Sequence, residues 1–205
     1  MKKVLITGGQ GDIAQAIRKQ LNQEGGYEVR TPGKEELDVT KEESVREYIE
    51  EYIPDILINN AGYVSPQSIK ECDMKHEKTS VEVNLLGVFY CSAVTLQVNP
   101  KAQIINIGSS AATKVHATWS SYCATKAAVV MATQCWAEDG VDVICISPGR
   151  TKTKMRKSLY PIEDASTLLL PEEFAVVVMK AIQHEYPAGS HINVNRQNYE
   201  EVVHG

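Results

Sequence analysis

The stretch "TGGQGDIA", Thr7 to Ala14, decides the fold. An apolar, β-branched run comes directly before it, and a pattern with Ile13, Ile17 and Leu21 at four-residue spacing follows it. A strand, a glycine-rich turn and a helix in this order are typical of a dinucleotide-binding turn. Glycines let the backbone approach a pyrophosphate, which binds the free N–H groups at the helix N-terminus. The alternative is an ordinary tight turn between a strand and a helix.

The alternation of apolar strands and helical segments continues along the whole chain. Continuously apolar strands need helices on both faces of their sheet. We therefore predict an α/β fold with a doubly wound parallel sheet in a single domain, residues 1–205, with a short C-terminal substrate region from about 150 to 205. Further strands are predicted at 27–31, 54–62, 103–110, 141–149 and 190–195, and helices at 12–25, 41–52, 76–98, 121–138 and 171–185.

Composition and charge argue against several classes of protein. The five cysteines are scattered and form no CxxC pair, so we predict neither a disulfide framework nor a metal site, and we expect a cytoplasmic protein with reduced thiols. The formal net charge of −5 argues against general nucleic-acid binding. No apolar run approaches the roughly 18 to 20 residues needed to span a bilayer, so no membrane partner is predicted.

The segment "SSYCATKAAVV", Ser120 to Val130, places a tyrosine and a lysine one helical turn apart. At about 5 Å and an effective dielectric near 20, the Lys126 ammonium would favour the Tyr122 phenolate by roughly 3 kcal/mol. That energy corresponds to about 2 pKa units and would bring the pKa of Tyr122 from about 10 towards 8. Such a phenol suits proton transfer near neutral pH. The alternative is a packed tyrosine beside a lysine with a buried stem.

Six motifs in order resemble those of the short-chain dehydrogenase/reductase family, from Lys2 to about Met155. This resemblance implies a Rossmann fold and an NAD(P)H-dependent oxidoreductase that transfers a hydride between nicotinamide and a carbonyl or hydroxyl group. The motifs are "TGGQGDIA", "NNAG" at 59–62, the asparagine of "VNLLGVF", the serine after "IINIG", the YxxxK pair, and "SPGRTKTKM" at 147–155.

The resemblance implies four catalytic residues. Tyr122 would donate a proton to the carbonyl oxygen, and Lys126 would lower its pKa and hold the nicotinamide ribose. Ser109, thirteen residues before Tyr122, would hydrogen-bond the substrate oxygen, with Ser110 as the weaker choice. Asn84 would anchor a proton-relay water.

The resemblance also implies a set of cofactor-binding residues. They lie at the ends of the predicted strands, where ligands of doubly wound sheets bind. The family's commonest glycine turn differs from this one, which carries Asp12 and Ala14 where glycines are usual, and an aspartate near a pyrophosphate is unfavourable unless it points away. The predicted set is Thr7, Gly8, Gly9, Gln10, Gly11, Asp12, Ile13, Thr31, Asp38, Val39, Asn60, Ala61, Gly62, Tyr122, Lys126, Pro148, Gly149, Thr151 and Thr153.

The end of the second strand favours NADP over NAD. NAD-binding chains place an acidic side chain on the ribose 2′-hydroxyl about 20 residues past the glycines. Here Thr31 takes that position, and Arg30 and Lys34 could meet a 2′-phosphate. Arg30 could equally be a plain exposed strand residue, and the chain could accept both cofactors.

The substrate is the least determined part of the prediction. "RTKTKMRK", Arg150 to Lys157, carries five basic residues in eight, which favours a small-molecule substrate with a phosphate or carboxylate group, while the alternative is a solvated loop. Two other functions stay open. One is a nucleotide-sugar epimerase or dehydratase, although few residues follow Thr153 for its larger C-terminal lobe. The other is a non-enzymatic NADP-binding sensor or scaffold. The resemblance also suggests a homodimer or homotetramer.

Overall fold

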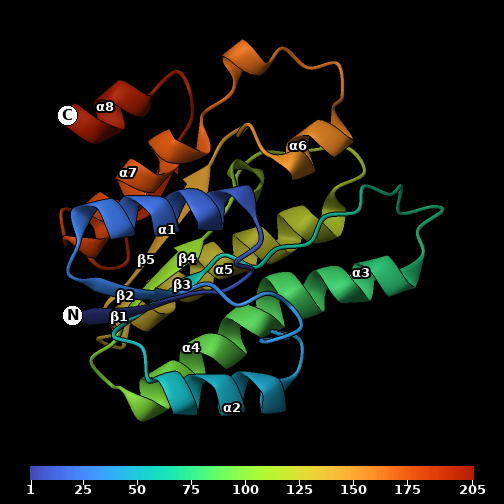
Figure 1. Cartoon of the computed structure of the whole chain (residues 1–205). Helices are drawn as coiled ribbons and strands as arrows, with labels where there is room; N and C mark the ends of the chain where they lie inside the picture. The colour runs from blue at the N-terminus through green and yellow to red at the C-terminus, as the bar shows by residue number, and fades with distance from the viewer.

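The computed structural model describes all residues from Met1 to Gly205 and confirms the doubly wound α/β fold (Figure 1). Six parallel strands form one sheet in the order β2-β1-β3-β4-β5-β6. The edge strand β2 and its neighbour β1 pair in register, with Val4 opposite Val29. The strands are β1 Lys2–Ile6, β2 Tyr27–Arg30, β3 Ile56–Asn59, β4 Gln103–Ile107, β5 Val143–Pro148 and β6 His191–Val194.

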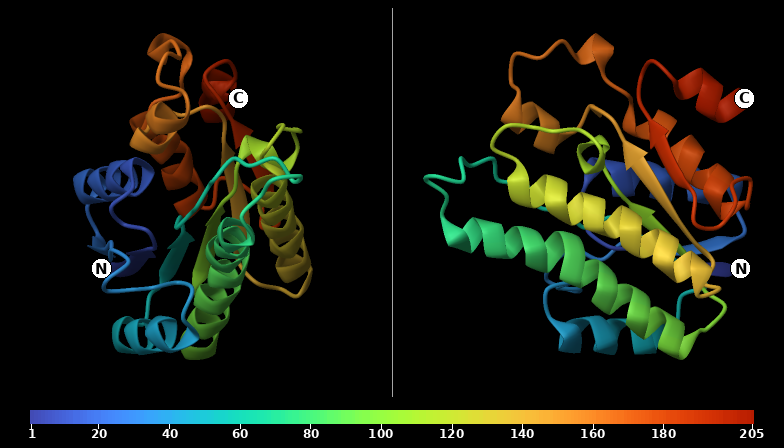
Figure 2. Two further views of the ribbon diagram at one scale, coloured as in Figure 1. Left: turned by 90° about the vertical axis from the view of Figure 1, so that its right-hand side faces the viewer. Right: turned by 180° about the vertical axis from the view of Figure 1, so that it is seen from behind.

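Helices cover both faces of the sheet, as the apolar strands require. One face carries α1 (Asp12–Glu24), α7 (Pro171–Ile182) and the short α8 (Tyr199–His204). The other carries α2 (Glu42–Tyr52), the helix α3 (Met74–Val81) that leads into α4 (Gly87–Val98), and α5 (Ser120–Glu138). Figure 2 shows α4 and α5 side by side when the molecule is viewed from behind.

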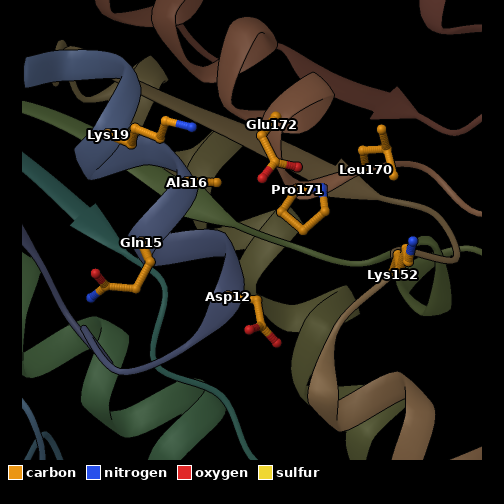
Figure 3. Close-up of a pocket in the computed structure, with 8 residues that line it drawn as sticks. All are labelled: Asp12, Gln15, Ala16, Lys19, Lys152, Leu170, Pro171 and Glu172. Atoms are coloured by element: carbon orange, nitrogen blue, oxygen red, sulfur yellow. The ribbon is translucent and has the colours of Figure 1, made fainter. Parts of the chain in front are cut away.

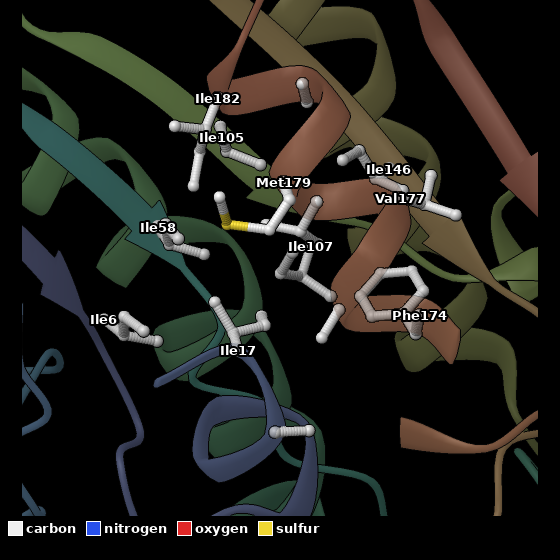
Figure 4. Packing of buried hydrophobic residues seen from close by; sticks show 14 of the residues in the cluster. Ile6, Ile17, Ile58, Ile105, Ile107, Ile146, Phe174, Val177, Met179 and Ile182 are labelled. Carbon is white, nitrogen blue, oxygen red and sulfur yellow. The ribbon is translucent and has the colours of Figure 1, made fainter. Parts of the chain in front are cut away.

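The core forms because alternate side chains of each strand point to opposite faces. Isoleucines on one face pack against Ile17 of α1 and against Phe174 and Met179 of α7 (Figure 4). The intervening strand residues pack against α2 and α4 on the other face. The first set includes Ile6, Ile58, Ile105, Ile107 and Ile146, and the second includes Leu5, Leu57, Ile104 and Val143.

The prediction that no segment is apolar and long enough to span a bilayer is wrong for one helix. Met74–Val98 forms 25 continuous helical residues with a mean hydropathy of 1.4 in its most apolar window. In the fold this helix packs on the sheet beside α2, and Cys91 and Val94 are fully buried there. Its apolar character therefore matches a helix of the protein core.

The topology creates a crevice at the carboxyl ends of the strands. The chain passes from β1 to β2 on one side and then crosses to β3 on the other side of β1. Ligands of doubly wound sheets bind where the strand order reverses in this way. Above the same edge lies α6 (Lys154–Leu159), a helix that the sequence did not predict in the basic segment.

Candidate active site

The glycine turn after β1 is shaped by close contacts with two neighbouring loops. Gly8 has a φ of +65°, and a Cβ there would lie 2.8 Å from the Ala61 Cα. A Cβ on Gly9 would lie 2.1 Å from the Thr31 carbonyl oxygen. Both distances are far below van der Waals contact, so these two positions require glycine to bring the turn against the loops after β2 and β3.

Gly11 leaves the N-terminus of α1 open toward the crevice. It precedes the helix with an ordinary φ of −72° and gives it no side-chain cap. The backbone N–H groups of Asp12, Ile13 and Ala14 have no hydrogen-bond acceptor within the protein. Free N–H groups at a helix start, together with the helix dipole, form an anion site. This end of α1 therefore fits a phosphate group.

The Asp12 carboxylate has a hydrogen-bond partner outside that anion site. Its Oδ2 accepts a hydrogen bond of 2.6 Å from the backbone N–H of Lys154, the first residue of α6. The carboxylate is thus turned to the start of another helix, where negative charge is favourable. This hydrogen bond joins the glycine turn to α6.

The "NNAG" asparagines all have hydrogen-bond partners, which fix the loop after β3. The Thr7 Oγ1 accepts hydrogen bonds of 3.0 Å from the backbone N–H groups of Asn60 and Ala61. The Asn60 side chain donates back to the carbonyl of Thr7, at 3.0 Å. Asn59 instead binds Asn106 of β4 at 2.9 Å, inside the sheet. Thr7 therefore holds the loop after β3 in place, but it is not among the residues that line the crevice.

A cavity of about 520 Å³ runs along this crevice. It contacts most of the predicted cofactor residues and two of the predicted catalytic residues. At one end lie Lys34, Leu37, Asp38 and Val39, and at the other lie Tyr122 and Lys126. Its remaining predicted members are Gly8, Gln10, Gly11, Asp12, Ile13, Asn60, Ala61, Gly62, Pro148 and Thr153.

Residues that the sequence missed also line this cavity, chiefly Tyr63, Thr79, Val83 and Met155. Tyr63 directly follows "NNAG", and Met155 ends "SPGRTKTKM", so proximity to the motifs was the signal available for both. Val83 directly precedes Asn84 in "VNLLGVF" and carries the same signal, whereas Thr79 of α3 carries none.

Tyr122 and Lys126 lie on the crevice side of α5, as their spacing predicts. The Lys126 side chain is buried, and its Nζ donates a 2.8 Å hydrogen bond to the carbonyl of Ile107 at the end of β4. Its Nζ is 5.9 Å from the centre of the Tyr122 ring. Ser109 lines the same hollow as Tyr122, and its Oγ accepts a 3.1 Å hydrogen bond from Ala111 N–H.

The electrostatics differ from the sequence prediction in one respect. Burial raises the pKa of Tyr122 above its usual value, and a hydrogen bond with Ser109 acts in the opposite direction without reversing it. The expected lowering towards 8 is therefore absent in this structure, in which Lys126 is directed to the Ile107 carbonyl. Burial also lowers the pKa of Lys126 from 10.5 to about 8. Tyr122 is thus a protonated phenol at neutral pH, and Lys126 is largely a cation.

Asn84 lies in a π-helical turn, Glu82–Leu86, between α3 and α4. The Asn84 side chain is fully buried and binds the backbone of Tyr63, which directly follows "NNAG". Its Oδ1 accepts from the Tyr63 N–H, and its Nδ2 donates to the Tyr63 carbonyl, both at 2.8 Å. A third bond of 3.1 Å goes to Ser80. In this structure Asn84 therefore positions the crevice wall at Tyr63.

A second hollow of about 130 Å³ adjoins Tyr122, and Ile13 at the start of α1 lines both this hollow and the larger cavity. Ser109, Gly149 and Thr151 line this hollow and not the larger cavity. Trp119 of the loop before α5 lines it as well, together with apolar residues of α6. The predicted site thus divides into a long crevice and a smaller pocket that meet at Tyr122.

The basic segment 150–157 is less available than its sequence indicates. Arg156 forms a two-pronged ion pair with Glu163, with both distances at 2.7 Å. Arg150 binds the same carboxylate at 3.1 Å. Lys154 lines the long crevice instead of the smaller pocket. The two arginines beside the smaller pocket therefore share an acidic partner that the sequence analysis did not consider.

The residues expected to select the cofactor also separate in space. Arg30 pairs with Glu51 at 3.3 Å and lies over the Tyr52 ring at 4.4 Å, and it does not line the crevice. Thr31 packs on Gly9 and does not line it either. Lys34 does line the crevice, and it has no ion-pair partner. Of the two residues predicted to meet a 2′-phosphate, Lys34 therefore lines the crevice, while Arg30 is paired with Glu51 outside it.

A separate groove of about 430 Å³ lies between α1 and the start of α7 (Figure 3). Its side chains mix both charges, with Lys19 and Lys152 opposite Asp12 and Glu172. None of the predicted catalytic residues lines it. The site therefore lies in the crevice and the adjoining pocket.

Two relatives are similar in sequence to this chain over most of its length. An uncharacterized oxidoreductase of Staphylococcus aureus (strain MRSA252) is 31% identical, over 94% of this chain and 84% of the relative. A protein of Bacillus cereus named benzil reductase ((S)-benzoin forming) is 26% identical, over 95% of this chain and 100% of the relative.

Solved structures share the fold. ElxO with NADP bound superposes with a TM-score of 0.86 at 23% identity, covering 98% of this chain and 100% of that one. The 3-ketoacyl-(acyl-carrier-protein) reductase of Brucella melitensis, complexed with NADH, gives 0.83 at 21% identity, covering 94% and 96%. The family model described as short chain dehydrogenase matches residues 2–164. The chain belongs to the short-chain dehydrogenase family, and it is an oxidoreductase of the kind that interconverts C=O and CH–OH groups.

Proposed function

We propose that this chain is a nicotinamide-dependent carbonyl reductase whose proton donor is Tyr122. The observation that carries the proposal is that Tyr122 and Lys126 line the same crevice as the open N-terminus of α1. A dinucleotide with its pyrophosphate at Gly11 and Ile13 would reach along that crevice to Tyr122. The nicotinamide supplies the hydride, and the protein orients it and supplies the proton.

The crevice offers a place for each part of the cofactor. Asp38, Val39 and Ala61 would hold the adenine, the N–H groups of α1 the phosphates, and Lys126 the nicotinamide ribose. Pro148, Gly149, Thr151 and Thr153 would bracket the nicotinamide. The carboxylate of Asp38 is already ordered by Thr40, whose hydroxyl donates to it at 2.7 Å.

The protonation states favour the reductive direction. A phenol that burial keeps protonated can donate its proton to the oxygen of a carbonyl that accepts a hydride. The phenolate left behind would lie one helical turn from the Lys126 ammonium, which stabilises it. Ser109 would hold the substrate oxygen beside Tyr122, because both line the smaller pocket.

NADP is our preferred cofactor, on the strength of Lys34. This side chain lies at the adenine end of the crevice, where its charge acts on Asp38 without a salt bridge between the two, so a 2′-phosphate would give it a direct partner. The test is the ratio of NADPH to NADH affinity in the wild type and in Lys34→Ala. A ratio above 1 that falls at least several-fold in the variant supports NADP. An unchanged ratio contradicts it.

An anionic substrate was predicted from the basic segment, and the contacts of that segment weaken the idea. Arg150 and Arg156 share the carboxylate of Glu163, which offsets one of their two charges, and Lys154 faces the cofactor crevice. We therefore assign Lys154 to the cofactor phosphates. Residues from about 150 to 205 would still form the substrate region, since α6 lines the smaller pocket.

A sugar-nucleotide epimerase and a non-enzymatic sensor are both disfavoured. The pocket beside Tyr122, at about 130 Å³, is small for a nucleotide sugar. The chain also keeps Ser109, Tyr122 and Lys126 around the point where the crevice and the smaller pocket meet, whereas a sensor needs no proton donor.

A cytoplasmic homodimer is the assembly that we propose. Apolar side chains remain exposed on the outer faces of α4 and α5, where Phe89 is 41% and Met131 60% exposed. The two helices lie side by side (Figure 2) and would offer a second copy a continuous face. The acidic net charge of −5 gives no support to nucleic-acid binding.

The experiment that tests the function is NADPH consumption against a panel of carbonyl compounds, with the wild type beside Tyr122→Phe. Benzil belongs in the panel, because one relative is named for it. Turnover by the wild type and its loss in the variant are expected. Cofactor binding without turnover of any compound would favour the sensor.

A further inference from the structure

We infer that the smaller pocket selects carbonyl compounds whose reacting carbon carries one flat, uncharged ring, and that Trp119 is the residue that selects it. The inference rests on the proposed function, since it places the substrate carbonyl at Tyr122 and Ser109. It names a substrate class that the position of the catalytic residues alone does not determine.

Trp119 lies directly beside Tyr122 in the smaller pocket. Its indole lies edge-on to the Tyr122 ring, with centroids 5.4 Å apart and planes at 86°. Both rings line the pocket. A substrate carbonyl at the Tyr122 hydroxyl would therefore have its substituent beside the indole. Aromatic rings favour such neighbours in offset or edge-to-face geometry.

The walls of the pocket are apolar around Trp119, and the two arginines that also line it, Arg150 and Arg156, share the carboxylate of Glu163. Val64, Ala111, Met155 and Leu159 line it with Trp119. Arg156 also lines it, but its Nε and Nη2 bind Glu163, and its guanidinium stacks 3.8 Å from the centre of the Tyr160 ring. One donor on Nε and one on Nη2 are therefore bound to Glu163, and one face of the guanidinium lies on Tyr160, so a carboxylate substrate would have to compete with that pairing.

The volume limits the substituent to about one ring. The pocket measures about 130 Å³. An apolar cavity of about 150 Å³ in another protein binds benzene. A six-membered ring beside the carbonyl therefore fits, while a second ring would have to extend toward solvent between α6 and the loop that holds Trp119.

Kinetics with a matched pair of ketones test the selection. Acetophenone and cyclohexyl methyl ketone differ in the flatness of one ring, and comparing their kcat/KM ratio between proteins cancels their intrinsic reactivity. Trp119→Ala should lower this ratio about 5- to 10-fold, mainly through the KM of acetophenone, and Trp119→Phe should restore most of it. Trp136→Phe is the control, because Trp136 lies in the last turn of α5 against Phe89.

Binding is measured separately, so that a failure of the proposed function can be recognised. The chain has two tryptophans, and Trp136→Phe leaves Trp119 as the only one. With NADP present, acetophenone should quench its fluorescence saturably, including in a protein that also carries Tyr122→Phe, and cyclohexyl methyl ketone should not compete well. Absence of turnover in the protein that keeps Tyr122, together with saturable quenching, would refute the proposed reductase function and leave the ring-binding role of Trp119 standing.

Three results would overturn the inference. The first is quenching that rises linearly with acetophenone concentration, as random collisions produce. The second is a ketone ratio that Trp119→Ala leaves unchanged. The third is a preference for phenylglyoxylate over acetophenone that disappears in Arg156→Gln, which would show that the arginine binds an anionic substrate.

Discussion

Replacing Lys126 with methionine should change the pH dependence of stability in a way that the structure specifies. Burial lowers the pKa of Lys126 to about 8, from 10.5. The drop is about 2.5 units, and each unit corresponds to about 1.4 kcal/mol, so keeping this cation in the folded chain costs about 3 kcal/mol. Lys126→Met removes the cation and leaves a side chain of similar length.

The sign follows from proton binding. Between pH 8 and 10.5 the unfolded chain holds a proton on Lys126 that the folded chain has released. Folded stability therefore rises with pH across this window, and the cost is fully present below pH 8 and absent above 10.5. The lost hydrogen bond to the Ile107 carbonyl adds an offset that does not depend on pH.

The assay is urea unfolding of wild type and Lys126→Met at several pH values from 7 to 10.5, without cofactor. The difference between the two proteins cancels the titration of every other group. We expect the wild type to gain about 3 kcal/mol on the variant across this range. A difference that stays constant with pH would refute the buried-cation account of Lys126.

Three further predictions follow from single contacts. Gly9→Ala should destabilise the fold by about 2–4 kcal/mol, because its Cβ would meet the Thr31 carbonyl at 2.1 Å. Gly11→Ala should instead fold but bind NADPH at least 10-fold more weakly. Equal thermal stability of the two variants would contradict this prediction. Asn84→Ala should cost about 2–3 kcal/mol in urea unfolding, because the Tyr63 N–H and carbonyl lose their partners, and Asn84→Asp should recover only part; an unaltered unfolding midpoint would argue that Asn84 does not hold the loop. Burial lowers the pKa of His191, so on acidification the unfolded chain binds a proton there before the folded chain does, and stability should fall as pH drops below about 6.5. His191→Gln should flatten that fall between pH 7 and 5. Parallel curves of stability against pH for the wild type and the variant would contradict this prediction.

The sequence predicted the sheet and the crevice because both depend on local patterns. Apolar strands, glycine turns and the Tyr122–Lys126 spacing each act within a few residues. What it could not predict depends on partners distant along the chain. Glu163 neutralises Arg156, Glu51 draws Arg30 away, and Asp12 meets Lys154, a contact spanning 142 positions.

The π-helical turn around Asn84 was also beyond the sequence. Its residues, Glu82 to Leu86, give no local sign of a wider turn, and the buried bonds of Asn84 to Tyr63 join it to a loop 21 positions earlier in the chain. The raised pKa of Tyr122 was likewise missed, because it comes from burial of the phenol, and the Lys126 ammonium that was expected to lower it binds the Ile107 carbonyl at the end of a different element. Spacing on one helix placed the two residues together but not their hydrogen bonds.

The most direct test of the central claim is a crystal structure with NADP bound. The account predicts the pyrophosphate at the start of α1, the adenine beside Asp38 and the nicotinamide between Pro148 and Tyr122, with the Lys126 ammonium on its ribose. A cofactor bound in the groove between α1 and α7, or a nicotinamide that does not contact Tyr122, would contradict it.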